Sequence, residues 1–265
     1  MPPPTLDPLS QEAPFRSIAD VGIRMPRALA SVEPEMRAVV ERLAGITRGA
    51  GIVMAAQEIA ADPSGALRTI LSLLKLLVFG RAQQTIDEVA SKAPRLDCKS
   101  GCAYCCYQNV EVTIPEAILV AAHLTAGDPR RERVLETAQA VAGLGDEERR
   151  RTGRPCPLLV DNKCSVYHDR PLMCRSILAV DAERCRAAHE SAVSGGPEVA
   201  VEYFAHAQYY VLGDQAGLRG ILKDMGVQYD LVDLTQAVAA ILRDPDLIDR
   251  WLARERVFGP DMIRA

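Results

Sequence analysis

The sequence predicts a mostly α-helical fold in which helical flanks surround an irregular, cysteine-rich centre, with at most a small β-hairpin. Apolar residues recur with helical spacing in the two flanks, residues 31–92 and 191–265. Between the flanks, residues 93–190 contain all eight cysteines, and the helical pattern breaks there into stretches rich in proline, glycine and charge. We expect these three regions to form one compact domain from residue 31 onward.

The N-terminal residues 1–30 precede the helical pattern and are expected to form a flexible, proline-rich arm. The first fifteen residues contain five prolines, and they lack the basic and apolar regions of a secretion signal. The most apolar run, Thr69–Gly80, is too short to span a membrane, which takes roughly 20 residues. We therefore expect a cytoplasmic protein with no membrane span.

Charge patterning argues against a nucleic-acid partner. The net charge is -4, with 31 basic and 35 acidic residues interspersed along the chain. Such a chain has no strong positive field to attract a phosphate backbone. The expected partner is instead an unidentified protein, either a binding partner or a substrate.

Helix signals define the N-terminal flank. Ser31 is a plausible N-cap, with acidic residues and a proline in the following turn, and it predicts a first helix over residues 32–48. Two further helices are predicted over residues 51–62 and 66–92, separated by a Pro-Ser-Gly turn.

The remaining elements follow from similar local signals. Thr113 is expected to cap a helix that begins with Ile-Pro-Glu, and a charged helix follows over residues 128–145. The turn at Asp161-Asn162-Lys163, between short apolar pieces, predicts the small hairpin. Further helices are predicted over the ranges 197–226, 231–244 and 245–258.

The cysteines carry the strongest functional signal. They form two groups, with the spacings C-x3-C-x2-CC and C-x7-C-x9-C-x10-C. Thiols stay reduced in the cytosol, so clustered cysteines there indicate metal or redox chemistry in preference to disulfides. A C-x2-C step lets two sulfurs approach one ion, and Gly101 allows the close backbone turn. The candidate metal ligands are Cys98, Cys102, Cys105, Cys106, Cys156, Cys164, Cys174 and Cys185.

The spacing of the cysteines does not identify the metal that they would bind. Neighbouring side chains diverge, so Cys105 and Cys106 are expected to serve two metals or opposite sides of a cluster. Eight thiolates would fill two four-thiolate zinc sites, whereas four of them could hold an iron-sulfur cluster, preferably of the 4Fe-4S type. The alternative is that some of these cysteines are only small buried apolar residues, above all Cys185, which lies near a helix start.

Several neighbours of the cysteines have two interpretations. His189 follows Cys185 by one helical turn and could reach the centre, but a lone histidine on a charged helix is more often solvated. Arg170 and Arg175 flank Cys174, where they could offset thiolate charge or form surface ion pairs. The sequence does not decide between these alternatives for either arginine.

The stretches CKSGCAYCCYQNVEVTIPEA and CPLLVDNKCSVYHDRPLMCRS resemble the CxxCxxCC cysteine-cluster family, described as a zinc- or iron-chelating domain. The resemblance covers about residues 95–190. It implies thiolate ligands at seven cysteines from Cys98 to Cys174, accompanied by Tyr167, Arg170, Pro171 and Arg175, and Cys185 fits a trailing cysteine seen in some relatives. The first gap here is three residues where the family name implies two.

The flagellin lysine N-methylases are similar in the same cysteine pattern. That similarity implies an iron-sulfur cluster used with S-adenosylmethionine. However, the chain has no glycine-rich nucleotide loop after a strand.

Three functions follow from the sequence. The first is an intracellular metal-binding protein that holds an iron-sulfur cluster or zinc ions through seven or eight cysteines. The second is a cluster-dependent protein-modifying enzyme such as a lysine N-methyltransferase, for which the sequence identifies no catalytic residue. The third is an interaction scaffold stapled by zinc. Whether the protein is an enzyme stays open.

Overall fold

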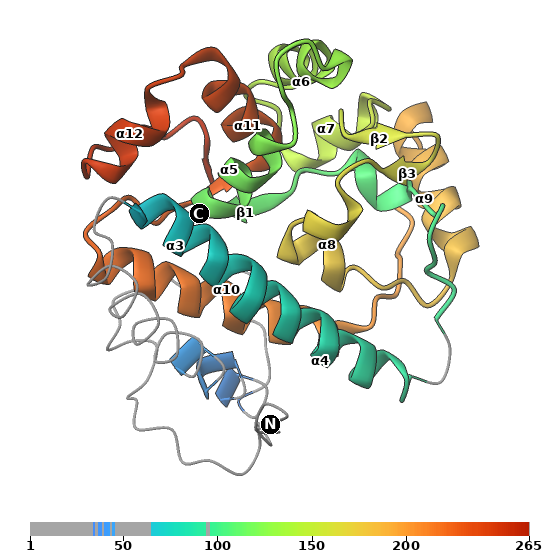
Figure 1. Cartoon of the computed structure of the whole chain (residues 1–265). Helices are drawn as coiled ribbons and strands as arrows, with labels where there is room; N and C mark the ends of the chain where they lie inside the picture. The colour runs from blue at the N-terminus through green and yellow to red at the C-terminus, as the bar shows by residue number, and fades with distance from the viewer. Residues whose placement is uncertain are drawn as a thin grey trace.

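The computed structural model describes residues 34, 37–38, 40–42, 44–45, 65–93 and 96–264. The predicted arm and the predicted helix over residues 51–62 lie outside the described residues. Those described between residues 34 and 45 are helical, in agreement with the helix predicted there. The predicted mostly helical fold is confirmed, with the cysteine-rich region in the middle (Figure 1).

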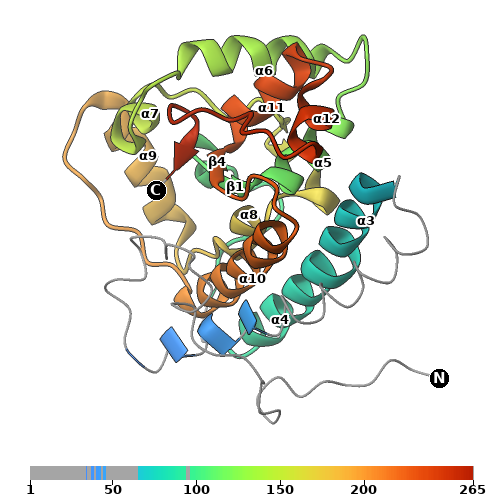
Figure 2. The same cartoon turned by 90° about the vertical axis from the view of Figure 1, so that its left-hand side faces the viewer.

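A long helix forms one side of the molecule. It runs through α3 (Ala66–Ser72), the π-helical segment η3 (Leu73–Phe79) and α4 (Gly80–Ala90). It packs beside the long helix α10 (Ala205–Asp224), as both views show (Figures 1 and 2). Apolar side chains of the two helices meet in a common core cluster. Its members include Leu74, Val78, Ala82, Val211, Leu218 and Ile221.

Two strand–helix units form the centre. In the first, β1 (Glu111–Thr113) leads directly into α5 (Ile114–Ala122); in the second, β4 (Leu231–Asp233) leads into α11 (Leu234–Arg243). The two strands pair antiparallel, and β5 (Ile263–Arg264) pairs with the other edge of β4.

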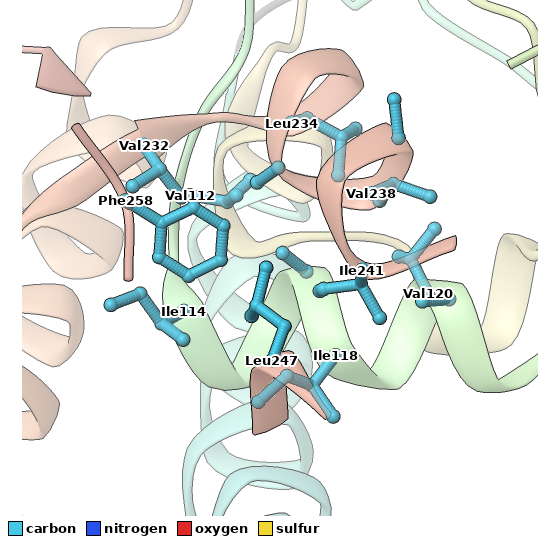
Figure 3. Packing of buried hydrophobic residues seen from close by; sticks show 14 of the residues in the cluster. Val112, Ile114, Ile118, Val120, Val232, Leu234, Val238, Ile241, Leu247 and Phe258 are labelled. Atoms are coloured by element: carbon cyan, nitrogen blue, oxygen red, sulfur yellow. The ribbon is translucent and has the colours of Figure 1, made fainter. Parts of the chain in front are cut away.

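The helices of these two units enclose the largest apolar cluster. Figure 3 shows Ile118 and Val120 of α5 facing Val238 and Ile241 of α11, while Phe258 covers the strands. All five side chains are buried. This cluster joins residues from the cysteine-rich region to residues of the C-terminal flank.

The remaining helices surround this centre. They are α6 (Pro129–Ala140), α7 (Asp146–Arg151), α8 (Leu172–Ser176), α9 (Ala182–Ser194) and α12 (Leu247–Leu252), with short 3-10 helices η4 (Tyr104–Tyr107) and η5 (Tyr167–Asp169). Aspartates at the N-caps of α6, α9 and α11 accept backbone hydrogen bonds from the first helical turn. These three caps explain why the helices begin where they do.

The predicted hairpin is confirmed. Its strands are β2 (Leu159–Val160) and β3 (Lys163–Cys164), which pair antiparallel. Asp161 and Asn162 both have positive φ, as the tight primed turn of a two-residue hairpin requires.

Several boundaries differ from the prediction, since α6 ends at Ala140 and α12 at Leu252, before the predicted ends at residues 145 and 258, and one sheet was not predicted. Residues 197–204 are not helical, since Tyr203 forms an antiparallel bridge with Ala179 and α10 begins only at Ala205. Residues Leu231–Asp233 form β4, where a helix start was predicted, because they pair with β1 and β5. The resulting three-stranded sheet is additional to the predicted hairpin. Within the described residues, none of the helices has the length and apolarity needed to cross a membrane.

Candidate metal centre

The first four cysteines lie on a tight turn and the short helix η4. A backbone hydrogen bond of 2.9 Å from Cys102 to Lys99 closes the turn, in which Gly101 has a φ of 95°. Only glycine adopts this backbone conformation without steric cost. The helix η4 then carries the adjacent Cys105 and Cys106. The sequence signal for a close turn at Gly101 is therefore confirmed.

The other cysteines come from separate elements that fold back onto this turn. The amide of Cys156 donates to the carbonyl of Cys106 at 2.6 Å, which joins the two cysteine groups directly. Cys164 lies on β3, Cys174 on α8 and Cys185 on α9.

Cys98 is tied to the segment that precedes α9. Its amide donates to the carbonyl of Ala179 at 3.3 Å. Its Sγ donates to the carbonyl of Ile177 at 3.6 Å. These bonds hold the start of the first cysteine group beside the helix that carries Cys185.

Cys105 lies at the electrostatic centre of the group. Its thiol interacts electrostatically with six other cysteines, which are Cys98, Cys106, Cys156, Cys164, Cys174 and Cys185. All eight cysteines are free. Segments that are far apart in the sequence are therefore gathered around one residue of η4.

The thiols fall into two sets of four according to whether they line one cavity, although Cys105 interacts electrostatically with members of both sets. We call Cys98, Cys102, Cys105 and Cys185 the pocket set, because all four line one cavity of about 590 Å³. We call Cys106, Cys156, Cys164 and Cys174 the hairpin set, because Cys156, which precedes the β2–β3 hairpin, interacts electrostatically with the other three. The adjacent Cys105 and Cys106 thus belong to different sets.

Burial favours the neutral thiol at most of these positions. It raises the pKa of Cys156 and of Cys185 to about 11, and the pKa of Cys174 well above its ordinary value. Cys105 differs, because a hydrogen bond with the Cys106 side chain stabilises its thiolate and lowers its pKa to about 7. The same bond, together with burial, raises the pKa of Cys106.

Arg170 is the cation that acts on both sets. Its charge favours the thiolate forms of Cys98, Cys105, Cys164 and Cys174, against the effect of burial. Its Nε is buried without a hydrogen-bond partner among the described residues. Of the two interpretations left open by the sequence, the structure favours charge compensation for this residue.

Arg175 is buried and holds the backbone around Arg170. Its Nε donates to the Arg170 carbonyl at 2.9 Å, and a second nitrogen donates to Gln83 of α4 at 3.1 Å. Its guanidinium lies 4.4 Å from the centroid of the Phe79 ring. It therefore acts as a connector between α8 and the long helix, and not as part of a surface ion pair.

Glu116 positions the helix that carries Cys174. Its carboxylate is fully buried, and it accepts hydrogen bonds from the amide and hydroxyl of Thr113 at 2.7 and 2.8 Å. The other carboxylate oxygen accepts from the amide of Leu172 at 2.7 Å. One side chain thus caps α5 and α8 together. The Thr-x-x-Glu pattern indicated the first cap, but nothing local in the sequence indicated the second.

Asp169 fixes the turn in front of α8. Its carboxylate lies 2.8 Å from the ammonium of Lys75 on η3 and 2.8 Å from Nε2 of His123 at the end of α5. These contacts anchor the turn that contains Arg170 to two helices.

His189 lies closer to the cysteines than the sequence indicated. It lines the same cavity as the pocket set, and its ring centroid is 4.1 Å from that of Tyr107 and 5.9 Å from that of Tyr104. The sequence favoured a solvated histidine, because the fold that brings η4 against α9 was not visible in the helical pattern.

The donor chemistry fits zinc or iron, since clustered thiolates are preferred ligands of both metals. In the described residues, however, no three cysteine, histidine or acidic side chains converge closely enough to hold one ion. The structure therefore gathers the eight cysteines without placing them in a closed coordination shell.

The comparison with protein families finds a match for this segment. Residues 97–192 match the CxxCxxCC family. The family is described as a putative zinc- or iron-chelating domain, and the CxxCxxCC segment contains all eight cysteines. No curated protein and no solved structure matches the chain. The similarity to flagellin lysine N-methylases thus stays a prediction.

Proposed function

We propose that this is an intracellular protein that binds iron or zinc through the cysteines of its CxxCxxCC segment. The observation that carries the proposal is the gathering of eight free thiols from separate elements around Cys105. Free thiols at this density persist where the compartment is reducing, which favours the cytoplasm.

We assign all eight cysteines as candidate ligands, four to each centre. Four thiolates suit either a zinc ion or a 4Fe-4S cluster, and the division into a pocket set and a hairpin set supplies four twice. Cys105 and Cys106 then bind different centres. This arrangement suits adjacent residues, because their side chains point in different directions and do not readily bind the same ion.

When bound, iron-sulfur clusters would supply electron transfer or cofactor activation, whereas zinc would supply mainly folding energy. The residues of this chain have distinct tasks in either case. Arg170 offsets negative charge from both sets, and Glu116 and Asp169 hold α8 and its preceding turn.

Serine variants test the assignment. Cys102→Ser removes a sulfur of the pocket set and Cys164→Ser removes one of the hairpin set, while Val193→Ser on the exposed face of α9 serves as a control. Two centres predict that each cysteine variant loses about half of the bound metal, measured per folded chain after anaerobic purification. Full metal content in both cysteine variants would exclude the assignment.

A protein-modifying enzyme is a second candidate, and one observation favours it. The pocket set lines a cavity, so a centre held there would face a space of about 590 Å³ that can admit a small molecule. The interaction scaffold has no comparable support.

A further inference from the structure

Several kinds of group line the cavity beside the pocket set. They include the four thiols, the aromatic rings of Tyr104, Tyr107 and His189, and Glu147, Arg150 and Arg151 of α7, while residues 196–201 add small and apolar side chains and Glu198. The helices α7 and α9, which both contribute to its lining, lie next to each other (Figure 2). A volume of about 590 Å³ lies within the range of small-molecule sites, which is roughly 300 to 1,000 Å³.

Arg150 of α7 lines this cavity. Its side chain is half-buried, and it makes no hydrogen bond or ion pair with any residue in the described part of the chain. The neighbouring Arg151 differs, because it pairs with Glu147 at 2.5 Å on the same helix. A half-buried guanidinium with all its donors unused is a strong site for a carboxylate or phosphate.

The aromatic wall adds a preference for a flat group. The rings of Tyr107 and His189 lie 4.1 Å apart at 42°, and Tyr104 lies 5.9 Å from His189. Tyr203 and Gln108 also line the cavity, and their side chains are hydrogen-bonded to each other. The positive charge of Arg150 interacts electrostatically with Tyr203. Flat rings gain dispersion and offset-stacking energy on such a surface.

We propose that this cavity binds a planar organic anion, whose negative group pairs with Arg150 and whose ring packs on Tyr107 and His189, next to the thiols of the pocket set. The inference rests on the proposed function for the role of the neighbouring thiols, but the binding of the anion itself depends only on the cavity. It identifies the ligand class of the centre and makes Arg150 the residue that selects for charge.

The test uses two probes that share one ring system. The anion 2-naphthoate carries a carboxylate, and 2-naphthamide carries a neutral amide of similar shape. Both are titrated by calorimetry into the anaerobically purified full chain, and the metal content of every sample is measured. The proposal predicts that naphthoate binds about tenfold or more tightly than naphthamide, the difference that one charge-assisted hydrogen bond contributes.

Variants separate the contributions of charge and ring. Arg150→Gln should abolish the preference for naphthoate over naphthamide, and Arg150→Lys should restore part of it. Tyr107→Ala should weaken both probes to a similar degree. Arg133→Gln, on the outer face of α6, is the matched control and should change neither affinity.

The outcomes are distinguishable from those of the metal proposal. Equal binding of both probes, or an unchanged preference in Arg150→Gln, overturns the inference even when the metal content is normal. Selective binding of naphthoate in a protein without zinc or iron supports the cavity and contradicts the proposed metal function. Binding of neither probe to a metal-loaded chain leaves the metal function standing and rejects the planar-anion site.

Discussion

Cys105 is the thiol whose chemistry differs most from that of its neighbours. Its pKa of about 7 depends mainly on the hydrogen bond with the Cys106 side chain, while burial acts in the opposite direction. A thiolate, and not a thiol, is the nucleophile in alkylation. In the metal-free protein, Cys105 should therefore react before the thiols whose pKa burial has raised.

The first prediction removes that hydrogen bond. In Cys106→Ala the pKa of Cys105 should rise toward its ordinary value, which lowers its thiolate fraction at neutral pH. The rate of alkylation of Cys105 by iodoacetamide at pH 7 should then fall about tenfold or more, since one pKa unit changes the thiolate fraction about tenfold. Peptide mass spectrometry of the metal-free chain gives the rate at each site.

Cys164→Ala provides the matched control, because it removes a thiol of the same set and leaves the Cys105–Cys106 hydrogen bond in place. An equal fall in both variants would show that the reactivity of Cys105 depends on the cluster as a whole.

Glu116 is a second residue on which several parts of the structure depend, because its carboxylate caps both α5 and α8. A buried carboxylate that accepts three hydrogen bonds loses part of this pattern when one oxygen is replaced by an NH2 group, since a donor then faces a donor. The second prediction is that Glu116→Gln lowers the free energy of unfolding by about 1 to 3 kcal/mol. Urea denaturation measures it.

The same substitution at the exposed Glu136 on α6 is the control and should change the free energy of unfolding by less than about 0.5 kcal/mol. A cost at Glu116 no larger than that at Glu136 would contradict its role as the shared cap of α5 and α8.

Among the elements, the β2–β3 hairpin depends on its turn. Asn162 has a φ of 59° and Asp161 a φ of 48°, and this left-handed conformation excludes β-branched residues. The third prediction is that Asn162→Ile costs about 1 to 2 kcal/mol of stability, whereas Asn162→Gly costs little or stabilises the protein. Thermal unfolding of the two variants compares them directly. Equal effects of both substitutions would mean that the turn can change its conformation freely.

Local signals in the sequence predicted several elements because their causes are local. The Thr113 cap depends on Glu116 three residues later, and the hairpin depends on the turn at Asp161 and Asn162, so short stretches contain the whole explanation. The strand Leu231–Asp233 was predicted as helix because its partners, β1 and β5, lie elsewhere in the chain. The position of Tyr203 was missed for the same reason, since it depends on pairing with Ala179.

The candidate site likewise combines features that the sequence indicates locally with features that depend on distant parts of the chain. The spacing made all eight cysteines candidate ligands, which stays a prediction, whereas the separation into two sets depends on how α8, α9 and the hairpin fold around η4. Arg150 and Tyr107 had no signal of their own, because an arginine on a charged helix and a tyrosine beside cysteines acquire a role only when α7 and η4 meet at one cavity.

For the whole molecule, the CxxCxxCC segment does not contain its own core. Helix α5 of this segment packs on α11 of the C-terminal flank, and α8 packs on both α4 and α10. The largest apolar cluster includes Ile118 from the segment together with Val238 and Trp251 from outside it. We propose that the segment and the helical flanks fold as one domain.

The fourth prediction follows from this interleaved core. An isolated fragment of residues 97–192 should lack stable structure even with zinc or iron supplied, because its apolar helices lose the surfaces on which they pack. Far-ultraviolet circular dichroism and amide exchange of the fragment, beside the full chain, measure this. A fragment that folds and binds metal with the affinity of the full chain would show that the segment is an independent domain.

Whether the eight cysteines hold metal is decided by metal and acid-labile sulfide analysis with a visible spectrum, all on one anaerobically purified sample of the full chain. We predict zinc or iron bound in proportion to folded chain. Iron with matching sulfide and a broad absorption near about 400 nm would identify clusters, and about two colourless zinc ions per chain would identify closed four-thiolate sites. A folded, stable chain with eight reactive thiols and neither metal would contradict the proposed metal binding.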